Sequence, residues 1–139
     1  MRTHRRTHRR SVRVEYLLPD EAASARRARR LTTVFLTRSR HRMAQVDAGH
    51  IDDATLIASE LVTNAGRHGR SACRLRLQVS DDRVTVEVYD DNPNQPRVRP
   101  LTAEGESGRG LAMVRCLAQR FDIIPVSGGG KRVRAVLAI

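Results

Sequence analysis

The sequence predicts an α/β two-layer sandwich, in which three helices cover one face of a mixed, largely antiparallel sheet. Three observations lead to this fold class. Stretches of alternating apolar and polar residues, typical of half-buried strands, occur near both ends of the chain and in its middle. Stretches with apolar residues at helical spacing lie between them. The 139 residues suffice for one domain with one hydrophobic core.

The first half of the chain predicts one strand and two helices. Residues 11–18 alternate and end at Pro19, which indicates a strand. Apolar residues then recur at helical spacing from 21 to about 43, with arginines on the opposite side. A second helix is predicted to begin near Ile51 and to stop at Gly69. The apolar faces are predicted to contain Ala25, Ala28, Leu31, Val34 and Phe35 in the first helix, and Ile57, Leu61 and Ala65 in the second.

The second half predicts a hairpin, a long loop, a helix and two more strands. The hairpin turns at 80–82, and the loop contains three prolines and almost no apolar periodicity. The helix opens on glycines. Along the chain these elements are strands at 73–79 and 83–90, a loop at 91–107, a helix at 108–121, and strands at 122–126 and 131–139. The apolar face of this helix would contain Leu111, Val114, Leu117 and Ala118.

Composition narrows the class of protein. The formal net charge is +11, and Lys131 is the only lysine among many arginines. Residues 1–10 form a basic segment that we expect to be a solvated, disordered tail, and 11–139 form the domain. Cys73 and Cys116 lack CxxC spacing, which favours reduced, packed thiols in a cytoplasmic protein. No apolar run approaches the roughly 20 residues of a membrane span, so no membrane association is expected.

Common nucleotide-binding and catalytic motifs are absent from the sequence. The stretch 128–132 is not a P-loop, because Arg132 stands where a hydroxyl residue is required. The glycines at 105–110 lack the GxGxxG order. The HRD and DFG signatures of kinases and the GxSxG elbow of hydrolases are missing, and no His, Cys and carboxylate cluster has zinc spacing.

Four short groups of polar and glycine residues remain, each on or beside a different predicted element. Glu60 and Asn64 are one helical turn apart, with Cβ atoms roughly 5–6 Å apart, so a carboxylate and an amide could share one small ligand. Asp90 ends a strand before two prolines, residues 108–111 (GRGL) open a helix, and 128–131 (GGGK) precede the last strand. Each piece alone has an ordinary alternative: a solvated pair, a turn residue, a tight turn and a hairpin loop.

In their order and spacing these pieces resemble the GHKL superfamily of gyrase, histidine kinase and MutL ATPases. Within it, the likeness is to the anti-sigma factor serine/threonine kinases and related small ATP-binding regulators of actinobacteria. Their ELVTNAVRH, DxSPxxP and GRGLxxV motifs are similar to ELVTNAGRHG (60–69), DDNPNQP (90–96) and GRGLAMV (108–114). The resemblance covers residues 11–139 and implies a Bergerat-type ATP-binding fold.

The resemblance also implies roles for these residues, with ATP and Mg²⁺ as ligands. Asn64 would bind Mg²⁺ through its side-chain oxygen, and Glu60 would orient or deprotonate the attacking hydroxyl. Asp90 would accept a hydrogen bond from the adenine amino group. Residues 91–107 would form an ATP lid, and glycines at a helix N-terminus would let backbone N–H groups approach the phosphates. The other implied ATP-binding residues are Asn92, Gly108, Arg109, Gly110, Leu111 and Lys131.

The chain departs from the family pattern outside these roles. Gly66 replaces an apolar residue in the helix, and Phe121-Asp122 stands where Trp-Gly is common. Arg132 and Arg134 stand where the family often has a hydroxyl residue and Trp. These departures concern nucleotide affinity and the surface that a partner would recognise, and they leave the metal and adenine residues intact.

Three functions from different classes remain open. The first is a kinase that transfers the γ-phosphate of ATP to a serine of an anti-anti-sigma (STAS) partner; in this family such proteins also hold a sigma factor and often form homodimers. The second is a non-catalytic, ATP-sensing module that binds partners. The third is a nucleic-acid binder acting through the arginine-rich N-terminus, which follows from charge alone. Glu60 favours the first, and the third is the least favoured.

Overall fold

The computed structural model describes residues 11–41, 45–68, 72–91 and 109–139, without the side chains of 66–68 and 109. The predicted tail 1–10, the stop at Gly69 and nearly all of the predicted loop lie outside these residues. The elements follow each other in the order β1 (Ser11–Leu18), α1 (Ser24–Arg40), α2 (Ala48–His68), β2 (Cys73–Ser80), β3 (Arg83–Asp90), α3 (Arg109–Leu117), β4 (Arg120–Val126) and β5 (Gly130–Ala138).

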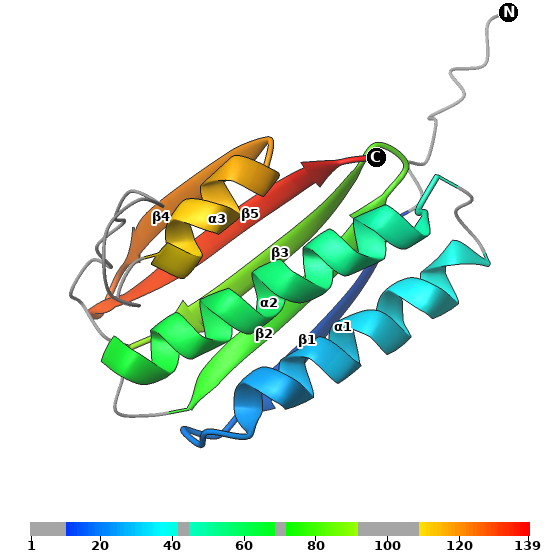
Figure 1. Ribbon diagram of the computed structural model, residues 1–139. Coiled ribbons are helices and arrows are strands. Elements are labelled where there is room, and N and C mark those ends of the chain that lie inside the picture. Colours follow the sequence, from blue (N-terminus) through cyan, green and yellow to red (C-terminus); the bar gives the residue numbers. More distant parts are fainter. Residues whose placement is uncertain (1–10, 42–44, 69–71, 92–108) are drawn as a thin grey trace, which may run out of the picture.

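The five strands form one sheet, and the three helices lie on one of its faces (Figure 1). The strand order is β1-β2-β3-β5-β4. Each of the four pairings is antiparallel, so the sheet that the sequence predicts as mixed is antiparallel throughout its described strands. The predicted two-layer α/β sandwich is confirmed.

The core lies between the helices and the inner face of the sheet. Every second residue of the central strands points inward, so Leu75 and Leu77 of β2 and Val84 and Val86 of β3 are completely buried. Removing such a side chain from water contributes about 1.5–3 kcal/mol. The core is largely aliphatic; among the described residues Phe35, 9% exposed, is its one buried aromatic side chain, and Tyr16 and Phe121 pack against it. The outer face of the sheet has no helix over it in the part of the chain that the structure describes (Figure 1).

Helix α1 buries Ala28 and Phe35 as predicted, but its buried face differs from the predicted one at other positions. Val34 was expected inside but is 42% exposed, whereas Thr32 and Ser39 are buried. Their hydroxyls donate to the carbonyl oxygens of Ala28 and Phe35, at 2.7 and 2.8 Å, so neither is buried without a partner. These hydrogen bonds within the helix therefore allow two hydroxyl residues to lie in the core, although the hydrophobic pattern did not include them in the buried face.

Helix α2 begins at Ala48, about one turn before the predicted start. Asp47 precedes it, and its Oδ1 accepts a hydrogen bond from the backbone N–H of His50 at 2.8 Å. In return, the Asp47 N–H donates to His50 Nδ1 at 3.1 Å, in a reciprocal arrangement like a capping box. The hydrogen bond from His50 holds the pKa of the Asp47 carboxyl below its usual value. The predicted inner face is confirmed: Ile57, Leu61 and Ala65 are at most 3% exposed.

Helix α3 is shorter than predicted. It ends at Leu117, and residues 120 and 121, which were assigned to the helix, begin strand β4. Phe121 packs against the core from that strand. Both cysteines are free thiols; Cys73 is buried as expected, but Cys116 is exposed, so the prediction of two packed thiols is wrong for Cys116. None of the helices in the described ranges is long and apolar enough to cross a membrane.

Candidate functional site

Four elements that are distant along the chain meet at one end of the sandwich. Helix α2 contacts both β3 and α3, and β3 pairs with β5. The C-terminal ends of α2 and β3 therefore lie near the starts of α3 and β5, at the left in Figure 1. The described parts of the sequence motifs, residues 60–68, 90–91, 109–114 and 128–131, belong to these four ends.

Helix α2 supplies a carboxylate and an amide from neighbouring turns. Asn64 lies three residues after the buried Leu61 and is itself only 9% exposed. Glu60 is half-buried. Because Leu61 anchors this part of the helix in the core, the backbone positions of both polar residues are fixed by packing. The predicted i, i+4 pair is thus at the inner edge of the helix and not on a solvated surface.

The carboxylate of Glu60 rests directly on the first turn of α3. A Cβ atom added to Gly110 would lie 2.8 Å from Glu60 Cδ and would overlap its Oε2. Only glycine leaves the space that this carboxylate occupies. Two of the predicted site residues, 50 positions apart, are therefore in contact, and the backbone at the start of α3 is open to close approach.

Asp90 and Lys131 form a buried ion pair. Their Cα atoms are partners in the β3–β5 register, and Lys131 Nζ donates to Asp90 Oδ1 at 2.9 Å. Both side chains are only 2% exposed. The two strands also approach each other closely at the neighbouring Gly130. A Cβ atom added there would lie 2.6 Å from the Asp90 carbonyl oxygen. The sequence named both residues as ATP-binding candidates but did not predict that they contact each other.

Comparison with known proteins identifies the family of the chain. The profile of the histidine kinase-like ATPase domain matches residues 18–137. The chain belongs to this family. The predicted relation to the GHKL superfamily is thereby confirmed, and membership of this ATPase domain family implies ATP as a ligand.

A solved structure shares the fold of this ATPase domain. The crystal structure of the RsbU and RsbW domains of Rv1364c from Mycobacterium tuberculosis superposes with a TM-score of 0.66 at 20% sequence identity. The match covers 91% of this chain and 32% of the other, so the ATPase domain spans about a third of that protein's length. A search of curated proteins gives no significant match.

The ATPase domain places a thiol beside the buried ion pair, which the sequence did not predict as part of the site. Cys73 begins β2, next to the end of β3, and is 6% exposed. Burial, and secondly the negative charge of Asp90, raises the pKa of this thiol from 9.0 to about 11. The neutral thiol therefore forms an apolar boundary on this side of Asp90.

The remaining predicted residues of the ATPase domain divide into two groups. Asn92 and Gly108 lie outside the described residues, as does the side chain of Arg109, although its backbone begins α3. Leu111 is 2% exposed and belongs to the core, so any contact of this residue with a ligand would fall to its backbone.

A metal ion would depend on few protein ligands in the ATPase domain. Among the described residues, no group of three His, Cys, Asp or Glu side chains could hold a metal. Mg²⁺ commonly keeps several waters and takes phosphate oxygens as ligands, so a single amide oxygen such as that of Asn64 fits this chemistry.

Proposed function

We propose that this ATPase domain binds Mg-ATP where α2, β3, α3 and β5 meet, and that it is an anti-sigma-factor-type kinase. It would transfer the γ-phosphate of ATP to a serine of an anti-anti-sigma (STAS) partner in the cytoplasm. The observation that carries the proposal is the contact of Glu60 with the glycine opening of α3, one turn from Asn64. The anti-sigma kinase motifs of the sequence and the fold shared with a chain that contains an RsbW domain support it.

The metal and phosphate contacts would come from α2 and α3. Bound Mg²⁺ would neutralise phosphate charge. Asn64 would offer its amide oxygen, and its burial on α2 limits the orientations of that side chain. The N-terminus of α3 would present backbone N–H groups to the phosphates, and Gly110 leaves space there that the Glu60 carboxylate occupies. Gly108 and Arg109 are proposed as further phosphate contacts.

Glu60 would serve as the general base for the acceptor serine. As the serine oxygen forms its bond to the γ-phosphorus and the bond to the departing ADP breaks, the hydroxyl proton would pass to the Glu60 carboxylate. Glu60 is half-buried and thus retains access to a docked partner.

Asp90 would recognise adenine from the opposite side of the site. Its carboxylate would accept a hydrogen bond from the adenine amino group, a bond to a charged group worth about 1.5–3 kcal/mol. Lys131 would act through Asp90: the 2.9 Å contact between Lys131 Nζ and Asp90 Oδ1 fixes the orientation of the carboxylate. Asn92 and Leu111 complete the proposed nucleotide contacts.

Phosphotransfer from labelled ATP to candidate STAS proteins tests the kinase proposal. Glu60→Gln should lower the transfer rate about 10²–10⁴-fold, the usual contribution of a general base, while ATP still binds. Asn64→Ala should remove the magnesium-dependent part of ATP binding. Glu15→Gln, which changes an exposed glutamate on the far face of the sheet, is the matched control. Transfer at the wild-type rate by Glu60→Gln would exclude Glu60 as the base.

A second candidate function is a non-catalytic ATP sensor. It is favoured by the position of Glu60, whose carboxylate links α2 to the start of α3, immediately after residues 92–108. Nucleotide binding there would change how α3 sits on α2 and so which partner, a STAS protein, a sigma factor or a second copy of the chain, is bound. In the same experiment this function gives ATP-dependent partner binding without phosphate transfer.

A further inference from the structure

The uncovered face of the sheet is rich in arginine. Residues that alternate with the core positions point away from the helices on all five strands. Among the described residues, seven arginines and three carboxylates occupy this open face. The arginines are Arg13, Arg74, Arg76, Arg83, Arg120, Arg132 and Arg134, and the carboxylates are Glu15, Glu87 and Asp122.

The carboxylates of the open face are all paired with arginines. Glu15 contacts Arg76 at 3.7 Å, Glu87 contacts Arg132 at 3.0 Å, and Asp122 contacts Arg134 at 3.2 Å. Four arginines pair with none of these three carboxylates: Arg13, Arg74, Arg83 and Arg120. One of them, Arg83, also reaches Asp82 in the β2–β3 turn at 3.2 Å. The open face therefore carries a surplus of positive charge after its own carboxylates are neutralised.

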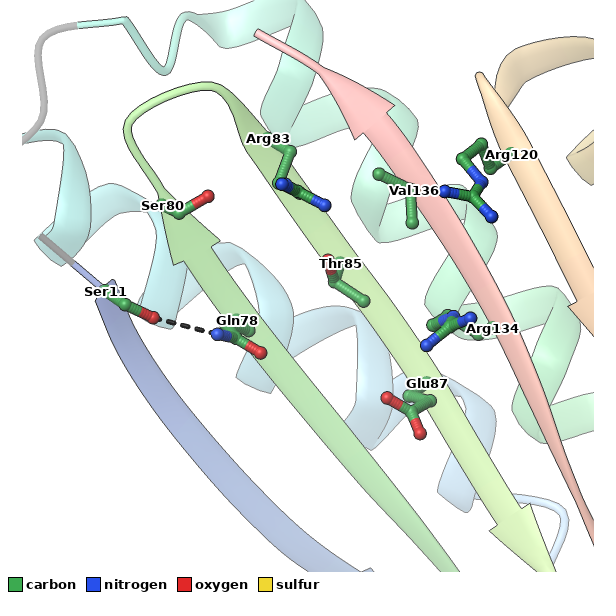
Figure 2. A pocket seen from close by; sticks show the side chains of 9 residues that line it. All are labelled: Ser11, Gln78, Ser80, Arg83, Thr85, Glu87, Arg120, Arg134 and Val136. Carbon is green, nitrogen blue, oxygen red and sulfur yellow. Dashed lines mark hydrogen bonds between the residues drawn. The ribbon is translucent and has the colours of Figure 1, made fainter. Parts of the chain in front are cut away.

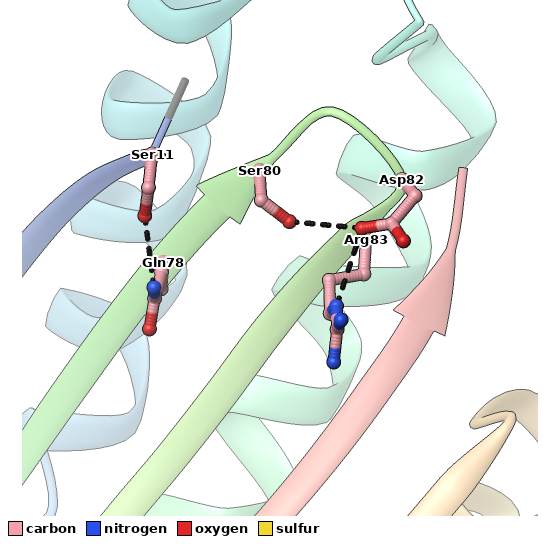
Figure 3. Close-up of polar contacts among 5 residues, drawn as sticks. All are labelled: Ser11, Gln78, Ser80, Asp82 and Arg83. Carbon is pink, nitrogen blue, oxygen red and sulfur yellow. Dashed lines mark hydrogen bonds and ion pairs between the residues drawn. The ribbon is translucent and has the colours of Figure 1, made fainter. Parts of the chain in front are cut away.

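A first hollow on the open face is lined mainly by hydrogen-bond donors. It has a volume of about 390 Å³, and its walls include Arg83, Arg120, Arg134 and Thr85 (Figure 2). Hydroxyl and amide groups of β1 and β2 form its other side, where Gln78 Nε2 donates to Ser11 Oγ at 2.8 Å (Figure 3). Guanidinium groups beside hydroxyls match the oxygens of a phosphate group.

A second hollow adjoins the first, since Glu87 lines both. It has a volume of about 270 Å³ and is lined by Tyr89, Val126 and three arginines, Arg74, Arg76 and Arg132. Two carboxylates, Glu15 and Glu87, also line it. An aromatic ring beside an arginine offers a stacking surface for a nucleobase, and carboxylates accept hydrogen bonds from base amino groups.

We propose that the open face binds single-stranded nucleic acid. A phosphate would occupy the hollow between Arg83, Arg120 and Arg134, and an adjacent base would stack on Tyr89. The argument is one of chemical pattern: a nucleic-acid strand places a stacking base beside each anionic phosphate. The face places a hollow with an aromatic ring, three arginines and two carboxylates beside a donor-rich hollow. The proposal does not depend on ATP binding, because it concerns the opposite face of the sheet.

Two other occupants fit the open face less well. An acidic peptide could pair with the arginines, but its carboxylates would also meet Glu15 and Glu87 in the second hollow, and it offers no base to stack on Tyr89. A second copy of the chain, placed face to face, would set one arginine surplus against another, which is unfavourable. Both become outcomes of the test below.

The test measures binding of the full chain to a fluorescent single-stranded oligonucleotide by anisotropy at several salt concentrations. Arg83→Ala/Arg120→Ala should weaken binding and make the slope of log K against log salt shallower by about 1.4, since each lost phosphate contact on a single strand contributes about 0.7. Tyr89→Leu should weaken binding about 5- to 150-fold through the loss of stacking. Thermal melts of each variant check that the fold is retained.

The matched control removes the same charge from another surface. Arg26→Ala/Arg29→Ala changes two exposed arginines of α1 and should leave the affinity and the salt slope near wild type. The proposal is overturned if the two double variants weaken binding equally, or if the oligonucleotide does not bind. It is also overturned if a polyglutamate peptide of equal charge binds as tightly and responds to the same variants, or if sedimentation shows a dimer that Arg83→Ala/Arg120→Ala dissociates.

Discussion

At the scale of single residues, the buried pair of Asp90 and Lys131 has the largest energetic consequence. The ammonium of the chain's only lysine and the Asp90 carboxylate are almost completely removed from water. Such a pair gains little over two apolar residues, but breaking it leaves one buried charge without its partner. The pair therefore matters less for net stability than for holding the Asp90 carboxylate in place at the end of β3.

Lys131→Met should destabilise the protein by about 3–5 kcal/mol, because it leaves the Asp90 carboxylate buried without its cation. The double variant Asp90→Leu/Lys131→Met should recover much of that loss. Arg134→Ala, which removes a pair about one-third exposed, should cost only about 0–1 kcal/mol. Urea unfolding measures all three. Equal losses for Lys131→Met and Arg134→Ala would contradict the buried pair.

Cys73 gives a second residue-scale prediction, which concerns pH. At pH 8 iodoacetamide should alkylate the exposed Cys116 and spare Cys73, whose pKa is raised to about 11. Because the folded pKa lies above the ordinary value of 9.0, the thiol's contribution to stability is complete below about pH 9 and is lost as the pH rises through about 11. The difference in unfolding free energy between wild type and Cys73→Ala should shrink over that interval, and a constant difference would count against it.

Some contacts within the site follow from the sequence alone, whereas others depend on the register in which β3 pairs with β5. The spacing of Glu60 and Asn64 places them on adjacent turns of any helix, so their proximity was predictable. The pairing of Asp90 with Lys131 depends on how β3 aligns with β5, two strands that are not consecutive in the chain. A one-residue shift in register would turn one of these side chains to the other face of the sheet. Sequence alone does not fix that register.

At the scale of elements, hydrophobic periodicity located each helix and strand of the described residues but misjudged some of their buried faces and ends. In α1 the arginines and apolar residues suggested a stripe that includes Val34, whereas the buried stripe contains Thr32 and Ser39. Hydroxyl residues that bond to their own helix are invisible to such a pattern. Helix α3 was extended to Phe121 because the apolar spacing continues into β4, with no proline or glycine in between to mark the change.

The contact between α2 and α3 gives the element-scale prediction. Alanine in a helix is usually about 0.5–1 kcal/mol better than glycine, so Gly110→Ala would stabilise an open helix. Here the added Cβ overlaps the Glu60 carboxylate, and we expect a net loss of about 1–3 kcal/mol. Urea unfolding should show this loss. Adding Glu60→Ala should abolish it, and Gly49→Ala, whose Cβ would lie 3.3 Å from Asp47 Oδ1, is the control. A destabilised double variant would indicate another cause.

At the scale of the whole molecule, one sheet separates two chemically different surfaces. The covered face, over which the helices lie in Figure 1, holds the core and, at one end, the proposed nucleotide site. The open face holds the arginines and the two hollows, the first of which Figure 2 shows. The predicted sandwich required the open face to exist, because three helices cover only one side of the sheet. The residues of the open face alternate with the core-facing residues of each strand. They could therefore be assigned from the sequence only after the core-facing residues were known.

This separation predicts that the two surfaces act independently. At 100 times its dissociation constant, Mg-ATP should stabilise the fold by about 2.7 kcal/mol, which for a domain of this size corresponds to a rise in melting temperature of several degrees. Asn64→Ala should lose the rise, whereas Arg83→Ala/Arg120→Ala should keep it in full, because changes at distant sites without shared partners add. Calorimetric melts with and without Mg-ATP measure both effects. A reduced rise in the arginine variant would mean that the sheet transmits binding from one face to the other, and the two sites would then have to be treated as one coupled system.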